Sequence, residues 1–331
     1  MPTGKETKRV GIVGMGFYVP EKVLTNQDLA KMVDTSDEWI RTRTGIAERH
    51  IADKGTGTSD LSAKAALTAL KNAKLGPEDV DLLIVATATP DMPLPSCACL
   101  VQEKIGATKA AAFDLAAACA GFVYALFTAE QFIKNGTYKT ILVIGADLIS
   151  SYIDWTDRAT CVLFGDGAGA VVLQEVKSGG ILGTLIGSDG RYADLLTISA
   201  GGSKFPASAE TIKNKGHFLQ MNGSEVFKLA VRGMSDAVLK ALKASNVTLE
   251  EVDCFIPHQA NQRIIEAVSE RLKLSKEKIF VNLQKYGNTS SASCVIALCE
   301  ALQVGKIKKK DKVVLATFGS GLVWGAMVLE W

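Results

Sequence analysis

Histidine and net charge are what this sequence has least of. Its 331 residues include 3 histidines, and 37 basic residues nearly balance 35 acidic ones, which leaves a formal net charge of +2. A chain without a net field of one sign has no general attraction to nucleic acid or to an anionic membrane. We therefore expect neither partner, and an acidic partner would have to bind to a local basic patch.

Long apolar runs are missing as well. No stretch reaches the roughly 20 residues that a membrane-spanning helix needs, and the first residues lack the apolar region and cleavage site of a signal peptide. The 7 cysteines are an odd number and mostly have apolar neighbours, which is typical of reduced thiols. These absences predict a cytoplasmic protein.

An internal repeat is the most informative feature that is present. Residues Ala69–Val85 align without a gap with Ala241–Pro257 at an offset of 172, with 7 of 17 positions identical. The same offset places Cys119 over Ser291. The chain is long enough for two domains of ordinary size. We predict two like halves, residues 1–176 and 177–331, related by a pseudo-twofold axis, with a small-molecule site at the seam between them.

Both halves alternate strand-like and helix-like patterns in the same order. The expected strands are Val10–Val13, Leu82–Ala86, Ile141–Ile144, Val162–Leu173, Ile181–Ile186, Cys254–Pro257, Val313–Thr317 and Val323–Glu330. The expected helices are Ser62–Ala73, Ser96–Ile105, Cys119–Lys134, Ser224–Ala244, Asn261–Lys273 and Ser291–Val304. This alternation favours an α/β protein, which we predict to form five layers, αβαβα. The helices that begin near Cys119 and Ser291 should form the central layer, because both are apolar on nearly every face.

Cys119 is the candidate nucleophile. It follows small residues and precedes Ala120-Gly121, a context in which a strand can turn into a helix with the thiol near the helix N-terminus. The positive end of a helix lowers the pKa of a thiol, which predicts a reactive thiolate. The alternative is a buried structural cysteine, since free cysteine is among the most buried residue types.

The scarcity of histidine limits the possible partners of this thiol. His258 follows a short buried strand, at the carboxyl end where open α/β sheets place ligands. His50 and His217 lie in the polar insertions Glu21–Lys54 and Asp189–Asn222, where we expect solvated side chains. Long insertions without clear periodicity are more often functional than not.

Two further segments carry groups that suit the same chemistry. Asn288, in YGNTSSAS, lies three residues before Ser291 and should reach the seam from the opposite half. A helix-capping turn is its alternative. The segment TFGSGLVWGA, residues 317–326, predicts a strand–turn–strand whose backbone N–H groups can stabilise an oxyanion, although a plain glycine hairpin has the same composition.

The sequence indicates no metal or cofactor. One residue, rather than two, separates Cys97 from Cys99, which argues against zinc. The glycines of residues 11–16 lack the third glycine and the following helix of a dinucleotide loop, and FGDGAGA at 164–170 also lacks a helix. Both glycine sets should instead allow close backbone packing at the seam.

Six motifs together resemble β-ketoacyl-acyl-carrier-protein synthase III, a family of the thiolase superfamily. They are DEWIRTRTGI, DLAAACAGF with Cys119, FGDGAGA, IPHQANQRI with His258, YGNTSSAS with Asn288, and FGSG. They occur in this order along the whole chain. The elongating synthases of the superfamily use two histidines with their cysteine, and the motif of Trp39 and Arg43 favours the initiating synthase over chalcone-synthase-like enzymes.

The resemblance implies a thiolase-like fold and a decarboxylative Claisen condensation that initiates fatty acid synthesis without a cofactor. An acyl group from acyl-CoA would pass to Cys119, and malonyl-acyl carrier protein would lose CO₂ and attack it. His258 and Asn288 would hold the oxyanion of the decarboxylation. Backbone N–H groups of Cys119 and Ser320 would form the oxyanion hole of acyl transfer, although the family usually has glycine where this chain has Ser320.

The resemblance also implies binding residues. Those for CoA are Trp39, Arg43, Arg158, Gly223 and Asn261, and those for the acidic carrier protein are Lys228, Arg263 and Arg271. Glu270 replaces a basic residue that is common in the carrier-protein patch. Leu94 corresponds to the residue that crosses a homodimer interface and closes the partner's acyl pocket, and its size would admit longer or branched primers.

Two other functions remain open at this stage. A thiolase-like protein without turnover can use Cys119 as a redox sensor, although a sensor needs neither His258 nor Asn288. An enzyme of the same fold can use an acyl-cysteine to form an ester or an amide. The product made from malonyl-carrier protein distinguishes this second alternative from the condensation.

Overall fold

The apolar segments of the repeat form two sheets. The computed structural model describes residues 8–331. The first sheet has the strand order β1 (Val10–Tyr18), β7 (Gly167–Glu175), β6 (Ile141–Asp147), β4 (Leu82–Ala86) and β5 (Ala111–Leu115). The second has the order β8 (Gly180–Ser188), β13 (Val323–Glu330), β12 (Lys312–Gly319) and β11 (Cys254–Pro257).

The duplication is visible in the strand order and in the register. Without β5, the first sheet runs β1-β7-β6-β4, and the second runs β8-β13-β12-β11 in the same sense. Leu82 pairs with Ile141 in a parallel ladder, and Cys254 pairs with Val313 in another. Both partners in the second pair lie 172 residues after those in the first. The predicted pseudo-twofold relation of the two halves is therefore confirmed at the level of single residue pairs.

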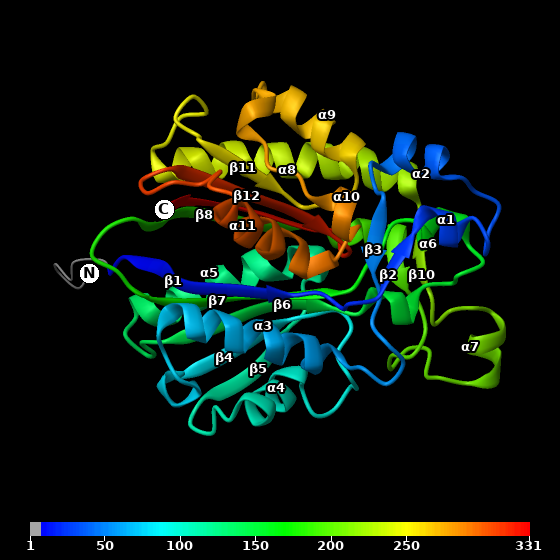
Figure 1. Cartoon of the computed structure of the whole chain (residues 1–331), viewed down its shortest axis with the longest axis horizontal. Coiled ribbons are helices and arrows are strands. Elements are labelled where there is room, and N and C mark those ends of the chain that lie inside the picture. Colours follow the sequence, from blue (N-terminus) through cyan, green and yellow to red (C-terminus); the bar gives the residue numbers. More distant parts are fainter. Residues whose placement is uncertain (1–7) are drawn as a thin grey trace.

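Helices occupy three layers (Figure 1). On the outer face of the first sheet lie α3 (Thr58–Ala73) and α4 (Cys97–Ile105), and on the outer face of the second lie α8 (Gly223–Ser245) and α9 (Gln262–Leu272). Between the sheets lie α5 (Gly121–Lys134) and α11 (Ser293–Gln303). The predicted five-layered αβαβα sandwich is confirmed.

The central layer is buried because its helices have apolar residues on most faces. In α11, every residue from Ser293 to Ala301 is buried. The core around α5 and α11 takes side chains from both sheets, including Ile84 and Val143 from the first and Ile256 and Leu315 from the second. All strands of the first sheet precede Val176 and all strands of the second follow it, but the halves share this core. Their division into two domains, 1–176 and 177–331, stays a prediction.

Each central helix is preceded by a 3₁₀ turn, η2 (Ala118–Ala120) before α5 and η6 (Ser290–Ala292) before α11. Ala118 has φ 43° and Ser290 has φ 51°, in the left-handed region that residues other than glycine rarely adopt. The α-helices were expected to begin at Cys119 and Ser291. They begin two residues later, because the left-handed residue turns the chain and a 3₁₀ bond closes before α-helical bonding can start.

Short elements fill the two insertions and gather at one end of the layers (Figure 1). The first insertion contains β2 (Val23–Thr25), α1 (Asn26–Leu29), α2 (Asp37–Thr44) and β3 (Glu48–His50), and the second contains η4 (Gly190–Leu195), β9 (Leu196–Ile198), α7 (Ala209–Lys213) and β10 (Leu219–Met221). Elements this short give too few turns or alternations for periodicity to reveal them. The remaining elements are η1 (Pro77–Asp79), η3 (Ile149–Tyr152), α6 (Arg158–Cys161), η5 (Lys276–Lys278) and α10 (Leu283–Tyr286).

Three details of the predicted strands and glycines were wrong. The strand expected over Val162–Leu173 begins at Gly167, because the buried Asp166 carboxylate turns aside to accept the N–H groups of Ala52 and Ser150. Strand β5 was missed, because AAFDL has no alternating pattern. Gly14 and Gly16 lie against α3, not at the seam, whereas Gly167 and Gly169 do lie at the seam, against α11.

No helix within residues 8–331 is both long and apolar enough to span a membrane.

Substitution of Leu298, which is fully buried in α11, tests the importance of the central layer. Leu298→Ala should lower the free energy of unfolding by about 2–5 kcal/mol, because it leaves a cavity in the core shared by both halves. Leu239→Ala, on the outer helix α8 where the leucine is 47% exposed, should change it by about 0.5 kcal/mol or less. Urea titrations followed by circular dichroism measure both, and equal midpoints would contradict the central position of α11.

Candidate active site

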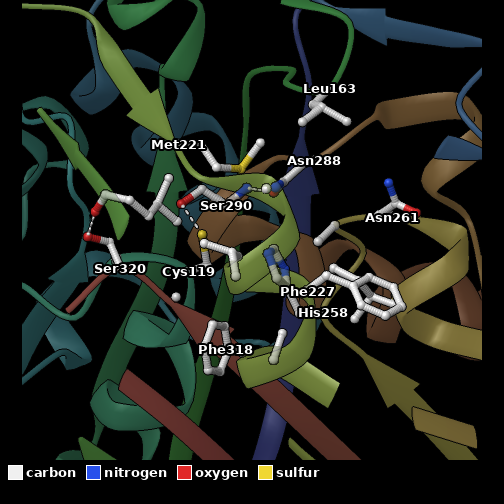
Figure 2. Close-up of a pocket in the computed structure, with 18 of the residues that line it drawn as sticks. Cys119, Leu163, Met221, Phe227, His258, Asn261, Asn288, Ser290, Phe318 and Ser320 are labelled. Carbon is white, nitrogen blue, oxygen red and sulfur yellow. Dashed lines mark hydrogen bonds between the residues drawn. The ribbon is translucent and has the colours of Figure 1, made fainter. Parts of the chain in front are cut away.

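A cavity of about 770 Å³ lies where the two halves meet. Cys119 reaches it from the first half, and His258 and Asn288 reach it from the second (Figure 2). The Asp189–Asn222 insertion contributes much of the apolar wall, and α2 contributes Arg43. The seam therefore holds a cavity where the repeat predicted a small-molecule site, and both insertions contribute to its wall.

Cys119 lies in the middle of η2, just after β5, and its Sγ accepts a hydrogen bond of 3.3 Å from the Ser290 hydroxyl (Figure 2). Burial raises the pKa of the thiol to about 12, while the bond from Ser290 lowers it and the negative charge of Asp147 raises it further. The expected net lowering by a helix N-terminus was wrong. The reason is that desolvation of the thiolate outweighs the donors around it, so the resting group is a neutral thiol.

His258 follows β11 and is almost fully buried. Its Nδ1 lies 2.5 Å from the Ser293 Oγ, and its backbone N–H donates to the Ala316 carbonyl. Burial lowers the pKa of the imidazole to about 4, so the ring is neutral at pH 7. The equivalent places of the first half hold Ala86 and Gly121, whose side chains have no polar group, and a Cβ added to Gly121 would lie 3.0 Å from the Ala86 Cβ. Only one of the two related sites carries a histidine.

Two hydrogen bonds to the first half hold the backbone of Asn288. Its backbone N–H donates to the Leu163 carbonyl at 2.8 Å, and its carbonyl accepts the N–H of Gly165 at 3.1 Å. Its side-chain Oδ1 accepts the N–H of Ser290 at 2.9 Å. This bond closes a local turn, whereas the N-caps of η6 and α11 are Thr289 and Ala292, so the capping alternative was wrong. The amide NH₂ of Asn288 is left as the group that can donate into the cavity.

The loop after β12 brings a second backbone close to the nucleophile. A Cβ added to Gly319 would lie 2.7 Å from the backbone nitrogen of Cys119, so only glycine fits there. Within residues 8–331, no backbone carbonyl accepts the N–H of Cys119 or of Ser320. In the described part of the chain, the Cys119 N–H contacts only its own sulfur, so both donors can bind an oxygen atom in the cavity. The Ser320 hydroxyl donates to the Leu196 carbonyl.

The predicted CoA-binding residues lie around one side of the cavity. The guanidinium carbons of Arg43 and Arg158 lie 4.9 and 4.7 Å from the centre of the Trp39 ring. Asn261 caps α9 and donates to the Arg43 carbonyl at 3.2 Å. Arg43, Gly223 and Asn261 line the cavity, whereas Trp39 and Arg158 flank it.

The predicted carrier-protein residues are less closely grouped. Lys228 and Arg263 line the cavity, but Lys228 pairs with Glu225 at 2.8 Å. Arg271 does not line it, and lies 3.5 Å from Asp236. Leu94 is also outside the cavity wall of this chain, and it is 85% exposed.

Several polar residues at the site were missed from the sequence. Ser290 was read only as part of a polar string, although its hydroxyl contacts the nucleophile, and Ser293 and Asp147 were not singled out. The repeat held a signal, because Ser290 and Ser293 correspond to Ala118 and Gly121. Where one half has a polar residue and the equivalent position of the other half has a small apolar one, the two halves differ in chemistry.

The other two histidines were expected to be solvated, and this was wrong. His50 is half-buried and donates from Nδ1 to the Pro20 carbonyl at 2.6 Å, and His217 is half-buried against Phe218. Among residues 8–331, no group of three or more His, Cys, Asp and Glu side chains is placed to hold a metal ion.

Comparisons with known proteins agree on one family. The family model described as 3-oxoacyl-[acyl-carrier-protein (ACP)] synthase III matches residues 113–190, and that of its C-terminal part matches residues 242–331. The chain is 55% identical over 322 residues to the beta-ketoacyl-[acyl-carrier-protein] synthase III of Caldanaerobacter subterraneus subsp. tengcongensis, with 97% of each chain covered. It is 56% identical over 323 residues to that of Desulfitobacterium hafniense strain Y51, with 97% of this chain and 98% of the relative covered.

A solved structure has the same fold. The crystal structure of 3-oxoacyl-[acyl-carrier-protein] synthase III from Aquifex aeolicus VF5 has a TM-score of 0.90 and 49% sequence identity. The match covers 97% of this chain and 100% of that one. The similarity therefore extends over both halves and both insertions.

The raised pKa of the Cys119 thiol predicts how the resting protein reacts with an alkylating agent. Since only the thiolate is nucleophilic, the rate of alkylation of Cys119 by iodoacetamide should rise about tenfold per pH unit from pH 7 to pH 9. Mass spectrometry of the peptide that contains Cys119 gives the rate at each pH. A plateau below pH 8 would mean that the helix start, not burial, dominates the pKa.

Proposed function

The chain belongs to the β-ketoacyl-[acyl-carrier-protein] synthase III family, and on that premise we propose that Cys119, His258 and Asn288 carry out its reaction. The enzyme condenses an acyl-CoA primer with malonyl-acyl carrier protein to give 3-oxoacyl-acyl carrier protein, CoA and CO₂, the first condensation of fatty acid synthesis. One observation carries the assignment of residues. The single thiol of the cavity comes from the first half, and the neutral imidazole and the free carboxamide come from the second.

In the first step, the sulfur of Cys119 forms a bond to the thioester carbon of acyl-CoA and the bond from that carbon to the CoA sulfur breaks. The proton lost by the thiol is balanced by the proton that CoA gains. The N–H groups of Cys119 and Ser320 stabilise the intermediate oxyanion, because they are unpaired and lie on adjoining backbones. The hydroxyl of Ser290 stabilises negative charge on the sulfur as the proton leaves.

In the second step, malonyl-carrier protein loses CO₂ and the resulting carbanion attacks the acyl-cysteine. Negative charge accumulates on the malonyl thioester oxygen before the new carbon–carbon bond forms. Nδ1 of His258 lies 2.5 Å from the Ser293 Oγ, and we assign the serine hydroxyl as the donor, which leaves the ring proton on Nε2. Nε2–H and the NH₂ of Asn288 then donate to the thioester oxygen. Expulsion of the Cys119 thiolate and its protonation complete the cycle.

The neutral state of the resting site supports this assignment. A cationic imidazole would be costly in so buried a place, and the low pKa of His258 keeps it neutral. Neutral donors can stabilise an anion that forms only during the reaction. The free enzyme then does not have to bury a charged group. A redox-sensing role for Cys119 would use neither the oriented Asn288 amide nor the neutral His258.

We propose that acyl-CoA binds with its adenine on Trp39 and its pantetheine arm past Gly223 and Asn261. The support is the pair of guanidinium groups that contact the Trp39 ring, since planar cations suit both an aromatic face and phosphates. The carrier protein would dock at Lys228 and Arg263 beside the mouth of the cavity. Arg271, engaged with Asp236, would contribute at the edge of that surface.

We propose a homodimer in which Leu94 reaches the partner's acyl pocket. Support comes from the 85% exposure of Leu94, an unusual state for a leucine, and from the neighbouring Met92, which is 44% exposed. The seven cysteines are all free, which supports work in the reducing cytoplasm.

Removal of the Asn288 carboxamide tests its role in decarboxylation. In Asn288→Ala, release of CO₂ from malonyl-carrier protein should fall by about 100- to 1000-fold, the usual effect of losing an oxyanion donor. Acyl transfer from acyl-CoA to Cys119 should fall by about tenfold or less, because the N–H groups of Cys119 and Ser320 remain. Radiolabelled substrates measure the two half-reactions separately. Asn72→Ala, on α3 away from the cavity, is the matched control, and unchanged CO₂ release in Asn288→Ala would contradict the role.

Replacement of Trp39 tests the CoA site. Trp39→Ala should raise KM for acyl-CoA by about tenfold and leave kcat nearly unchanged, because an aromatic stack contributes about 1–3 kcal/mol to binding a base. Tyr18→Ala is the control, since it also removes a ring that contacts a cation, but its cation, Lys64, does not line the cavity as Arg43 does. Steady-state kinetics at saturating malonyl-carrier protein gives both constants. A fall in kcat at unchanged KM would contradict the binding role.

A further inference from the structure

The two related halves present two equivalent turns, and only one of them is open to substrate. In η2, the N–H of Ala120 donates to the Ala117 carbonyl at 3.0 Å, and in η6 the N–H of Ala292 donates to the Thr289 carbonyl at 3.1 Å. The residues of the second bond lie 172 positions after those of the first. Cys119 and Ser291 therefore occupy the same place in the same turn.

The two equivalent N–H groups have different partners. That of Cys119 has no backbone acceptor within residues 8–331 and faces Gly319, the last residue of β12. That of Ser291 donates to the Asp147 carboxylate at 3.0 Å, and Asp147 is the last residue of β6. Asp147 and Gly319 are themselves 172 residues apart. In one half a carboxylate side chain thus lies between the strand end and the turn, whereas in the other the glycine lets the two backbones approach until no Cβ fits between them.

The Asp147 carboxylate is fully buried and accepts several hydrogen bonds. Besides the N–H of Ser291, one oxygen accepts the Ser291 hydroxyl at 2.7 Å. The other accepts the N–H of Ala88 at 2.7 Å and the hydroxyls of Thr87 and Thr89 at 3.1 Å each. Asp147 therefore joins the end of the first sheet to η6 of the second half.

The rest of the second site has no chemistry of its own. The positions that correspond to His258 and Asn288 hold Ala86 and Ala116, and the position of the nucleophile holds Ser291. Ser291 therefore lacks the histidine and the asparagine that Cys119 has. The group that this turn binds is the protein's own Asp147 carboxylate, not a substrate.

We propose that Asp147 is a positioning residue for the condensation, because its carboxylate binds the N–H of Ser291, the counterpart of the Cys119 N–H, and so fixes the segment Asn288–Ser291 against Cys119. The route is short. Asp147 holds Ser291, the adjacent Ser290 gives its N–H to the Oδ1 of Asn288, and the Ser290 hydroxyl reaches the Cys119 sulfur. The orientation of the Asn288 amide follows from this chain of bonds.

This inference rests on the proposed roles of Cys119 and Asn288. Asp147→Asn keeps the shape of the side chain, but one of its two oxygens becomes an NH₂ group that cannot accept a hydrogen bond. The segment Asn288–Ser291 loses part of its anchor. CO₂ release from malonyl-carrier protein should then fall by about 100-fold, the usual scale for misplacing a reacting group by an ångström, with a much smaller loss of acyl transfer to Cys119.

A second readout separates this positioning role from general damage. Asp147 places a negative charge near the Cys119 sulfur, so its neutralisation should lower the pKa of the thiol. The pH profile of alkylation of Cys119 by iodoacetamide should therefore move to lower pH in Asp147→Asn, although the variant is less active. A loss of stability alone would not slow CO₂ release and at the same time shift the alkylation of Cys119 to lower pH.

Asp166→Asn is the matched control. Asp166 is equally buried and accepts the N–H groups of Ala52 and Ser150 and the Ser150 hydroxyl, but it does not contact η6. This variant should lose thermal stability while the ratio of CO₂ release to acyl transfer stays that of the wild type. If Asp147→Asn changes that ratio and Asp166→Asn does not, the proposal is supported.

Ser291→Ala covers the case in which Asp147→Asn does not fold. It removes one donor to the carboxylate and keeps the N–H, so CO₂ release should fall by about fivefold, the scale of one lost hydrogen bond. Equal losses in both half-reactions, or no loss in either, would overturn the proposal. If Asn288→Ala impairs CO₂ release and these variants do not, only the positioning role of Asp147 fails. If Asn288→Ala has no effect, the proposed function itself fails.

Discussion

The contact between η2 and η6 on the pseudo-twofold axis is the constraint on which the rest of the structure depends. Both turns contain a residue other than glycine in the left-handed region, Ala118 and Ser290, a conformation that costs about 1–3 kcal/mol and persists only where the surroundings impose it. The surroundings here are two buried helices and the ends of two sheets. The two turns together place the Cys119 sulfur beside the Ser290 hydroxyl. Since one residue comes from each half, neither half forms this contact alone.

The electrostatics of the cavity follow from this burial. The thiol has a raised pKa and the imidazole a lowered one, so both groups are neutral in the resting enzyme. An apolar cavity does not have to solvate an ion until the reaction produces one. In the proposed mechanism, backbone N–H groups, the Asn288 amide and neutral His258 are already in place for that charge, which is the arrangement that preorganised stabilisation requires.

The sequence was sufficient for the fold, and it singled out three side chains that share one cavity. The repeat gave the two halves, their shared seam and the layer order, because register and burial are encoded in the spacing of apolar residues. The motifs identified the family and its thiolase-like fold, which the comparisons confirm. Cys119, His258 and Asn288 were found from their residue types and positions, and the structure brings all three into one cavity.

The sequence was not sufficient for what depends on three-dimensional surroundings. The sign of the Cys119 pKa shift was wrong, because desolvation by neighbours distant in the chain cannot be read from a helix start. The importance of Ser290, Ser293 and Asp147 was missed, because a serine or an aspartate in a string of polar residues has many ordinary roles. The short elements of the insertions were also missed, although they supply Arg43, Leu196 and Met221 to the cavity wall.

The central claim is that one thiol, Cys119, carries the acyl group between the two substrates. The most direct measurement is mass spectrometry of the intact protein and of its peptides after brief incubation with acetyl-CoA in the absence of malonyl-carrier protein. One acetyl group per chain, located on the peptide that contains Cys119 and released when malonyl-carrier protein is added, is the predicted result. Condensation that proceeds with no acetyl group on Cys119, or with it on another cysteine, would contradict the claim.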